Sequence, residues 1–218
     1  VDSSVGGKTG LDLPGGKNLV GAFWQPGLVL CDPDALATLP EREYRCGCAE
    51  IIKYAMLSSR RFLAELNATP VREQAERVIE RCVSIKRDLV ARDEFDRGSR
   101  RLLNLGHTVG HSVEACSAYR LSHGEAVSVG MAVITRAAAA KGICTEETLS
   151  ALLDTLEKYG LPTETDLPAD RLLAAMLNDK KRQGATLPLV VPEEVGRCRI
   201  EPVPVKELPL WLRLGGVR

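Results

Sequence analysis

Residues Arg100–Glu125, RRLLNLGHTVGHSVEACSAYRLSHGE, contain all three histidines of the chain. His107 and His111 are four residues apart in a segment whose pattern favours a helix, so their imidazoles would share one face. Arg100 and Asn104 precede them at intervals of about one turn, which predicts a polar column along that face. Histidine, asparagine and arginine in one column suit a binding site better than they suit the core or the solvent.

The grouped histidines predict a metal site, since neutral imidazole is the commonest protein ligand of transition metals. His123 follows a polar turn and would enter the site from a second segment. Such a site also needs a carboxylate or a thiolate. The spacing leaves Glu114, Glu125 and a residue distant in sequence as candidates. The alternative is that the i, i+4 histidine pair lies on the surface and binds nothing.

The composition predicts a helical protein with reduced thiols. The 218 residues can form one sizeable domain or two small ones, and the alanine, leucine, glutamate and arginine content favours helix. Lysine plus arginine and aspartate plus glutamate number 29 each, so the charge favours no nucleic-acid partner. No apolar run reaches the roughly 18 residues of a membrane span. Seven irregularly spaced cysteines favour packed thiols in a cytoplasmic protein.

The first 27 residues are rich in glycine and predict a loop. The run Gly6–Thr9 is similar to the end of a phosphate-binding P-loop, but the upstream glycine of that motif is absent. Backbone amides together with Lys8 and Lys17 still suit a phosphate or carboxylate; the alternative is an ordinary connecting loop. Leu28–Cys31 is predicted to be a short buried strand. The start at Val1, with no preceding strand, predicts that the chain is the back part of a longer protein.

The rest of the chain predicts a mainly α fold with a little β structure. Thr38 is a plausible N-cap for a helix that begins at Pro40. Further helices are expected at about 59–66, 71–92, 126–140, 146–159, 169–177 and 205–213, and a small hairpin at 187–191 and 197–200.

One lysine interrupts an apolar stripe in the helix expected over residues 71–92. Lys86 occupies a position where leucine or isoleucine would be expected. A lysine on the buried side of a helix needs an anionic partner or a route to water. Lys86 therefore either extends its ammonium to the solvent or points into a substrate cleft.

Five sequence blocks, in order, resemble 3-dehydroquinate synthase of the shikimate pathway: VDSSVGGKTG, GKNLVGAFWQP, TLPEREYRCGCAEIIKY, RDEFDRGSRRLLNLGHTVGHSVEA and HGEAVSVGM. The later NDKKRQG is similar to the end of that family. The resemblance implies an NAD-dependent lyase that requires zinc or cobalt. Its N-terminal α/β NAD domain would lie before Val1. Residues 1–32 would be the cleft loop and strand that accompany that domain, and residues 33–218 the helical metal- and substrate-binding domain.

The resemblance also implies the roles of individual residues. The metal ligands would be Glu50, His107 and His123. Residues in contact with the substrate would be Asp2, Lys8, Asn18, Lys53, Lys86, Arg100, Asn104, His111 and Lys181, of which Lys53, Lys86 and His111 would be catalytic. Residues beside NAD would be Asp2, Lys17 and Thr38.

The implied reaction converts 3-deoxy-D-arabino-heptulosonate 7-phosphate to 3-dehydroquinate and phosphate. The family resemblance implies a homodimer whose partner is a small sugar phosphate, with no nucleic acid and no membrane involved. Without the NAD domain, the 218 residues alone would be inactive. Two alternatives are another NAD- and zinc-dependent sugar-phosphate cyclase, of the 2-deoxy-scyllo-inosose or valiolone synthase type, and a metal-binding helical domain without catalysis. Arg100, Asn104 and His111 favour the dehydroquinate branch.

Overall fold

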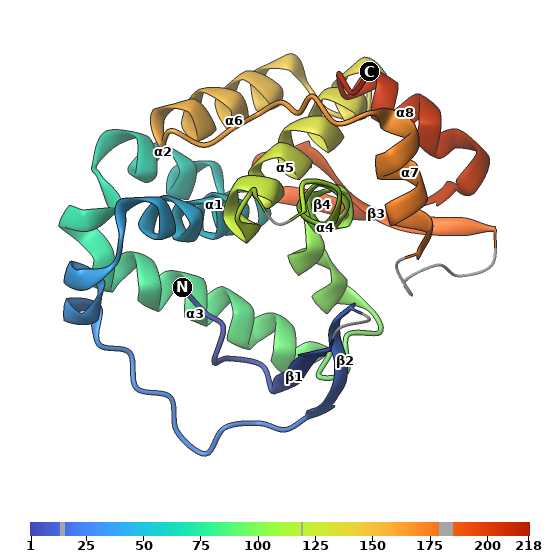
Figure 1. Cartoon of the computed structure of the whole chain (residues 1–218). Helices are drawn as coiled ribbons and strands as arrows, with labels where there is room; N and C mark the ends of the chain where they lie inside the picture. Colours follow the sequence, from blue (N-terminus) through green and yellow to red (C-terminus); the bar gives the residue numbers. More distant parts are fainter. Residues whose placement is uncertain (14–15, 119, 179–184) are drawn as a thin grey trace.

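The computed structural model describes residues 1–13, 16–118, 120–178 and 185–218, and over these ranges the fold is mainly helical, as predicted. Two separate antiparallel hairpins accompany the helices (Figure 1). The α-helices are α1 (Glu41–Ser58), α2 (Arg60–Ala68), α3 (Ala75–Arg92), α4 (His107–Cys116), α5 (His123–Ala140), α6 (Glu146–Lys158), α7 (Ala169–Asn178) and α8 (Leu208–Leu214). The 3-10 helices are η1 (Pro33–Thr38), η2 (Val71–Gln74), η3 (Ser99–Asn104) and η4 (Val205–Glu207).

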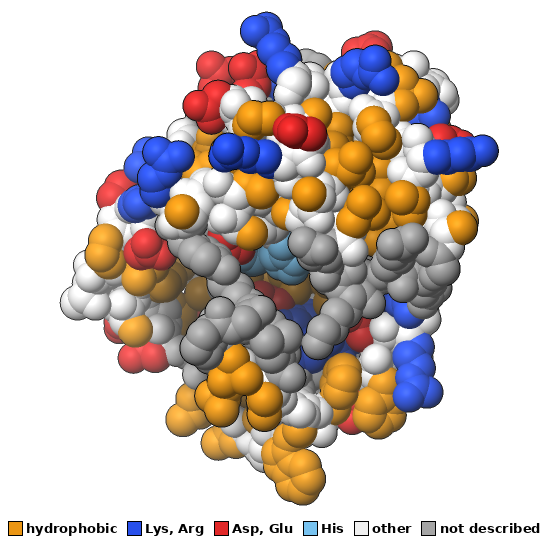
Figure 2. Space-filling model, turned by 45° about the vertical axis from the view of Figure 1, so that its right-hand side comes forward, with side chains coloured by type: hydrophobic (Ala, Val, Ile, Leu, Met, Phe, Trp, Pro, Cys, Tyr) orange, Lys and Arg blue, Asp and Glu red, His pale blue; other side chains and the backbone are white. Residues whose placement is uncertain are grey.

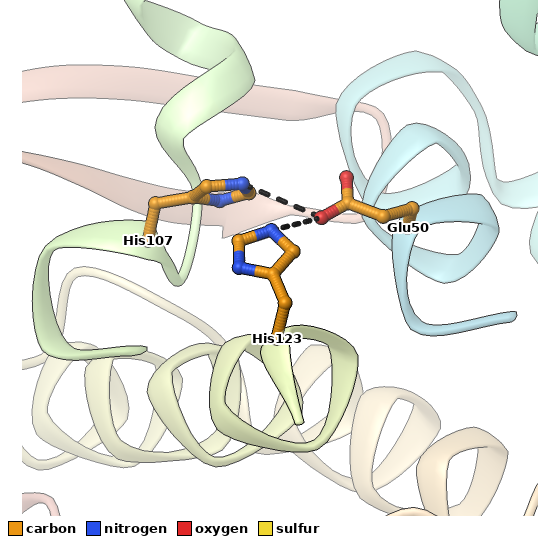
Figure 3. Close-up of side chains that lie close together, drawn as sticks. All are labelled: Glu50, His107 and His123. Atoms are coloured by element: carbon orange, nitrogen blue, oxygen red, sulfur yellow. Dashed lines mark ion pairs between the residues drawn. The ribbon is translucent and has the colours of Figure 1, made fainter. Parts of the chain in front are cut away.

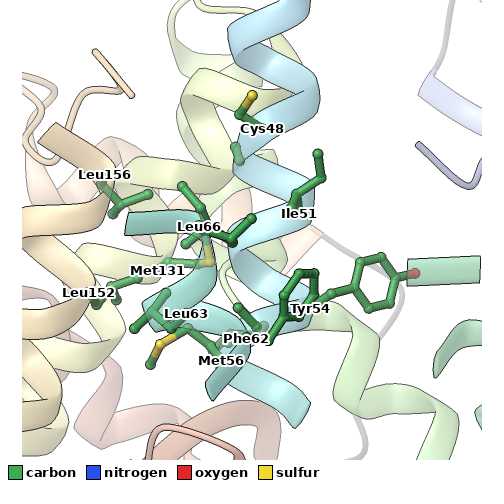
Figure 4. Close-up of a cluster of buried hydrophobic side chains, with 14 of the residues drawn as sticks. Cys48, Ile51, Tyr54, Met56, Phe62, Leu63, Leu66, Met131, Leu152 and Leu156 are labelled. Carbon is green, nitrogen blue, oxygen red and sulfur yellow. The ribbon is translucent and has the colours of Figure 1, made fainter. Parts of the chain in front are cut away.

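Helix α5 is the centre of the fold because most of its residues are buried, from Gly124 to Ala138. Such a helix is stable only when neighbouring elements cover it completely, and α1, α4, α6, α8 and β3 (Thr186–Glu194) all contact it. Two apolar clusters meet on α5. Met131 packs with residues of α1, α2 and α6 (Figure 4), and Val133 packs with residues of α4, α7, α8 and β3.

Glycines let α4 lie directly against α5. A Cβ on Gly130 would overlap the carbonyl oxygen of Gly106 and lie 2.8 Å from the amide nitrogen of Gly110. A Cβ on Gly110 would lie 3.0 Å from the carbonyl oxygen of Ala126. The two backbones are therefore in contact without side chains between them, and the position of α5 fixes that of α4.

The N-terminal glycine-rich stretch is a hairpin, so the prediction of a loop was wrong. β1 (Lys8–Leu13) pairs with β2 (Gly16–Phe23), and Gly10 lies opposite Gly21 in the register. A Cβ on Gly21 would overlap the carbonyl oxygen of Thr9, so this close pairing requires glycine. Glycine has a low strand propensity. Because this stretch contains many glycines, its sequence pattern predicted a loop rather than two strands.

The predicted buried strand at Leu28–Cys31 is also wrong. This stretch is irregular, and Leu28 and Leu30 are 76% and 85% exposed. A strand needs a neighbour that pairs with its backbone N–H and C=O groups, and no described residue pairs with this stretch. Trp24, just before it, is exposed as well. The apolar character of this stretch predicted a strand, but it gave no information about whether another strand lies alongside to pair with it.

Elsewhere the predicted elements are present with shifted ends. The second predicted hairpin is confirmed as β3 paired with β4 (Arg197–Pro204). The N-cap of α1 is Pro40, and Thr38 is the last residue of η1 instead. All seven cysteines are free, four of them buried. Among the described helices, none combines the length and the apolar character needed to cross a bilayer.

The contact between α4 and α5 predicts that Gly130→Ala lowers the free energy of unfolding by about 2 kcal/mol or more, because the added methyl group overpacks the interface. Gly47→Ala is the control, since a Cβ at this position in α1 meets nothing within 4 Å. This change should stabilise the chain by about 0.5–1 kcal/mol. Urea unfolding measures both. Equal stability of Gly130→Ala and the unchanged chain would show that the interface is not close-packed.

Candidate metal and anion site

Three elements bring Glu50, His107 and His123 together (Figure 3). Glu50 lies on α1, and each histidine is the first residue of its helix, α4 or α5. The Nε2 atoms of His107 and His123 lie 3.4 and 3.3 Å from Oε1 of Glu50. One ligand atom from each residue lies within 4.8 Å of the others. This is the spacing that a single metal ion requires.

The polar column predicted along one helix is broken. The 3-10 helix η3 ends at Asn104, and α4 begins only after Gly106, which has a left-handed backbone with φ of 76°. Gly106 tolerates that conformation because it has no Cβ. Arg100 and Asn104 therefore lie on a different element from His107, although all three face the same pocket.

The second nitrogen of each imidazole is held by an acceptor. Nδ1 of His107 lies 3.0 Å from the carbonyl oxygen of Leu105, and Nδ1 of His123 lies 3.5 Å from Oε2 of Glu114. An imidazole that donates from Nδ1 presents the lone pair of Nε2. Donation from Nδ1 to these two acceptors would leave both Nε2 atoms available to a metal ion between them and Glu50.

The protonation states of Glu50 and His107 fit a cation, whereas that of His123 is shifted towards the protonated imidazole. Burial would raise the pKa of Glu50, but the ammonium of Lys53 and the imidazole of His107 outweigh it and hold this pKa well below its usual value. Burial lowers the pKa of His107 to about 4, despite the nearby Glu50. The carboxylate of Glu50, with that of Glu114 beyond it, raises the pKa of His123.

One atom of the triad accepts no hydrogen bond from the described residues, although the two Nε2 atoms lie near it. Oε1 of Glu50 is buried without a hydrogen bond, while Oε2 accepts one from Nζ of Lys53 at 2.6 Å. A buried carboxylate oxygen without a partner is costly. A metal ion between Oε1 and the two Nε2 atoms would satisfy all three. Two histidines and a glutamate are a donor set suited to zinc or cobalt.

The triad opens into a pocket of about 460 Å³. Figure 2 shows histidine side chains within a hollow, with acidic and basic side chains beside them. Six of the residues predicted to contact substrate line the same pocket as the triad, namely Asp2, Lys8, Lys53, Lys86, Arg100 and Asn104. The structure therefore brings most of the predicted site together.

Lys86 lines the pocket and has an anionic partner, as a lysine on the buried side of a helix requires. Its Nζ lies 2.9 Å from Oδ2 of Asp2 and donates to the carbonyl oxygen of Asp2 at 2.8 Å. Tyr54 also donates to Oδ2 of Asp2. The positive charges of Lys86 and Lys53 outweigh the effect of burial and lower the pKa of Asp2. Sequence reasoning missed Tyr54, although it follows Lys53 directly and lies one turn after Glu50.

Arg100 is held in place by backbone carbonyls. It is 2% exposed, donates to the carbonyl oxygens of Glu94 and Gly6, and has a buried Nε without a partner among the described residues. Its guanidinium therefore retains a full positive charge beside the pocket. Lys8, at the pocket edge, pairs with Asp96.

The other predicted site residues are less closely connected. The ring of His111 lies 5.5 Å from that of His107 and 5.9 Å from that of His123, between centroids. Thr38 is exposed on η1, donates to the carbonyl oxygen of Ala35, and does not line the pocket. The side chains of Lys17 and Asn18 lie outside the described part of the chain, and so does Lys181.

The two other carboxylates that the sequence left open do not join the triad. Glu125 completes the capping box of α5 with Ser122 and pairs with Arg42 at 2.6 Å, and this arginine lowers its pKa to about 2. Glu114 contacts the far side of the His123 ring. Sequence reasoning also missed Cys46, which lines the pocket one turn before Glu50 and contacts Ser122.

Two family profiles match the chain. The one described as "3-dehydroquinate synthase C-terminal" covers residues 47–182, and the one described as "3-dehydroquinate synthase N-terminal" covers residues 1–46. The two matches meet within α1. The boundary predicted between residues 32 and 33 stays a prediction.

Curated relatives are similar over nearly the whole chain. The 3-dehydroquinate synthase of Streptococcus suis (strain 05ZYH33) is 40% identical over 222 aligned residues, covering 98% of this chain and 62% of the relative. That of Streptococcus pneumoniae (strain ATCC 700669 / Spain 23F-1) is 42% identical over 219, covering 97% and 62%. The chain therefore spans 62% of the length of these relatives.

Solved structures share the fold. A 2-epi-5-epi-valiolone synthase from Streptomyces hygroscopicus subsp. jinggangensis 5008, with NAD+ and Zn2+ bound, gives a TM-score of 0.87 at 29% identity, over 99% of this chain and 63% of that chain. A 2-deoxy-scyllo-inosose synthase complexed with carbaglucose-6-phosphate, NAD+ and Co2+ gives 0.82 at 24% identity, over 100% and 64%. The second likeness shows the fold alone.

The triad predicts that the chain binds one zinc or cobalt ion and that His107→Ala weakens this binding by more than about 100-fold. Removal of a hydrogen-bond partner of a ligand typically lowers metal affinity about 10- to 100-fold, and removal of the ligand itself should lower it further. His111→Ala is the matched control, because His111 begins no helix and lies outside the triad. Mass spectrometry of the metal content and chelator competition measure the effect. Equal metal loss in both variants would contradict the assignment.

Proposed function

Because this chain belongs to the 3-dehydroquinate synthase family, we propose that it forms the metal- and substrate-binding part of an enzyme of that activity. The proposed reaction converts 3-deoxy-D-arabino-heptulosonate 7-phosphate to 3-dehydroquinate and phosphate. The chain spans 62% of its curated relatives, so the activity is proposed for the full-length protein. The 218 residues alone are proposed to be inactive.

The observation that carries the proposal is that the triad and four cationic side chains line one pocket. Besides Glu50, His107 and His123, the lining residues include Lys8, Lys53, Lys86 and Arg100. The proposed substrate has a phosphate and a carboxylate, which lysine and arginine bind by charge-assisted hydrogen bonds. Its hydroxyl groups would face the metal ligands. The site therefore matches both kinds of polar group in the substrate.

Each cofactor has a proposed place. A zinc or cobalt ion held by Glu50, His107 and His123 would supply Lewis-acid polarisation of a substrate oxygen. The unpartnered Oε1 of Glu50 supports this assignment. NAD would accept and return the hydride, and Asp2, Lys17 and Thr38 are proposed to lie beside it. Of these, Asp2 is the residue that the structure describes at the pocket.

The chain's own side chains would bind, orient and move protons. Lys86 and Arg100 would hold the anionic groups and so fix the substrate relative to the metal ligands, which lowers the entropic part of the barrier. Asn104 would add a neutral hydrogen bond from the pocket wall. His111, next to both ligand imidazoles, would carry a proton to or from the substrate. Lys8, Asn18 and Lys181 are proposed as further contacts.

A related cyclase activity is the second candidate, supported by the fold shared with the valiolone synthase at 29% identity. The two candidates differ in the charge of their substrates. A pocket with four cationic side chains favours a substrate that has a carboxylate as well as a phosphate, because each anion needs its own partner. Sedoheptulose 7-phosphate, which has no carboxylate, is a suitable probe for this difference.

The proposal predicts that a chimera releases phosphate from 3-deoxy-D-arabino-heptulosonate 7-phosphate when NAD and zinc are present. The chimera joins the part of the Streptococcus suis relative that precedes its matched segment to residues 1–218. The 218-residue chain alone should release none. A chimera that acts on sedoheptulose 7-phosphate instead would support the second candidate, and one that binds zinc but turns over neither sugar would contradict both.

The anion contacts predict that Lys86→Met lowers kcat/KM of the chimera by about 10- to 100-fold, the effect of one charge-assisted contact. The control is Lys206→Met, since Lys206 is exposed on η4 and does not line the pocket. Steady-state phosphate release measures both variants. Wild-type kinetics of Lys86→Met would remove Lys86 from the proposed substrate contacts.

A further inference from the structure

We propose that Glu114 is a positioning residue for His123: its carboxylate holds the Nδ1–H of this imidazole and so directs Nε2 to the metal. The inference rests on the proposed function, because it assumes that Glu50, His107 and His123 bind a metal ion. Glu114 itself is no ligand, since it contacts the side of the ring that faces away from Glu50.

The contact joins a buried acid to a partly exposed base. Oε2 of Glu114 lies 3.5 Å from Nδ1 of His123, and their side chains are 6% and 46% exposed. The His123 ring is therefore not fixed by packing alone. A half-exposed imidazole can rotate about its side-chain bonds, and an acceptor at Nδ1 restricts that rotation and selects one tautomer.

Glu114 occupies a position that is unfavourable for a carboxylate. It is 5% exposed and lies in the last turn of α4, which ends at Cys116. Burial disfavours the charged form, and the negative end of the helix dipole repels it. Neither burial nor helix stability favours an acid here, whereas the contact with the imidazole of His123 does.

The two ligand imidazoles have acceptors of different strength. His107 donates to the neutral carbonyl of Leu105, whereas His123 faces the charged carboxylate of Glu114. A carboxylate behind a ligating imidazole increases its basicity and fixes its orientation. His107 is largely buried, with a side chain 13% exposed, and needs less support. The carboxylate is therefore paired with the more exposed of the two ligands.

The packing of α4 against α5 explains how Glu114 reaches His123. Gly106 lies against Gly130, and Gly110 lies against Ala126 and Val127. The next turn of α4 carries Glu114, and the preceding turn of α5 carries His123. The same close approach that builds the core thus brings this acid to the start of α5.

The experiment compares two substitutions in the 218-residue chain. Glu114→Met keeps the approximate volume but removes the acceptor, and Glu114→Gln keeps an acceptor oxygen without the charge. We expect Glu114→Met to weaken zinc binding by about 10- to 100-fold, and Glu114→Gln to weaken it less. Chelator competition measures the affinities. Thermal unfolding confirms that each variant is folded.

A second readout is independent of the metal. Nitrogen NMR of the histidine rings in zinc-free protein at pH 8.5 reports the tautomer of His123, which a His123→Gln spectrum assigns. The unchanged chain and Glu114→Gln should show Nδ1–H at His123. Glu114→Met should lose this preference. A purely structural role of Glu114 would leave the tautomer unchanged.

Glu125→Gln is the control for loss of a negative charge near His123. Glu125 lies two residues further along α5, but its carboxylate is engaged by Arg42 and Ser122. We expect the zinc affinity of Glu125→Gln to stay within about 2-fold of that of the unchanged chain. This change is smaller than the one expected when a hydrogen-bond partner of a metal ligand is removed. Unchanged affinity and tautomer in Glu114→Met would overturn the inference. If the unchanged chain binds no zinc, the proposed metal site fails, and the tautomer still decides whether Glu114 positions His123.

Discussion

Direct contact between the backbones of α4 and α5 is the constraint on which the proposed metal site depends. At Gly110 and Gly130 the two backbones approach each other without a side chain between them. Because His107 and His123 are the first residues of these helices, a change in helix spacing would move one imidazole relative to the other. α1 packs on α5 from another side and carries Glu50 to the same point. The triad is thus built on the rigid core rather than on loops.

Charge balance organises the rest of the pocket. Two carboxylates, Glu50 and Asp2, are each paired with a lysine, Lys53 and Lys86 respectively. Buried charges need such partners, since an unpaired ion loses its hydration without compensation. Arg100 differs because it donates to backbone carbonyls and keeps its charge. The pocket therefore has cationic groups that suit anions, while the carboxylates of Glu50 and Asp2 are stabilised by their own lysines.

The helices and much of the site could be predicted because their signals are local. The clustering of three histidines and the position of Lys86 on an apolar stripe follow from spacing alone. Glu50 could not be assigned from spacing, because it is far from the histidines in sequence. Only the family resemblance selected it. The break at Gly106 was missed because a helical pattern continues on both sides of a left-handed residue. The N-terminal hairpin and the exposed Leu28–Cys31 stretch were mispredicted. Strand pairing depends on which segment of backbone lies alongside, and the composition of a segment gives no information about its neighbour.

The pairing of Lys86 with Asp2 has a consequence for selectivity. Asp2 occupies the ammonium that an incoming anion would use, so the chain contains its own competitor for that position. A ligand that took the place of this carboxylate on the ammonium would lose part of its affinity, because the free energy of the Asp2 contact would be subtracted from it. A small monoanion that contacts Lys86 alone would gain too little free energy to replace Asp2. A ligand that also contacts Arg100 and the proposed metal ligands would gain additional binding free energy from those contacts. The pairing with Asp2 would therefore disfavour small anions that contact Lys86 alone, without a steric barrier.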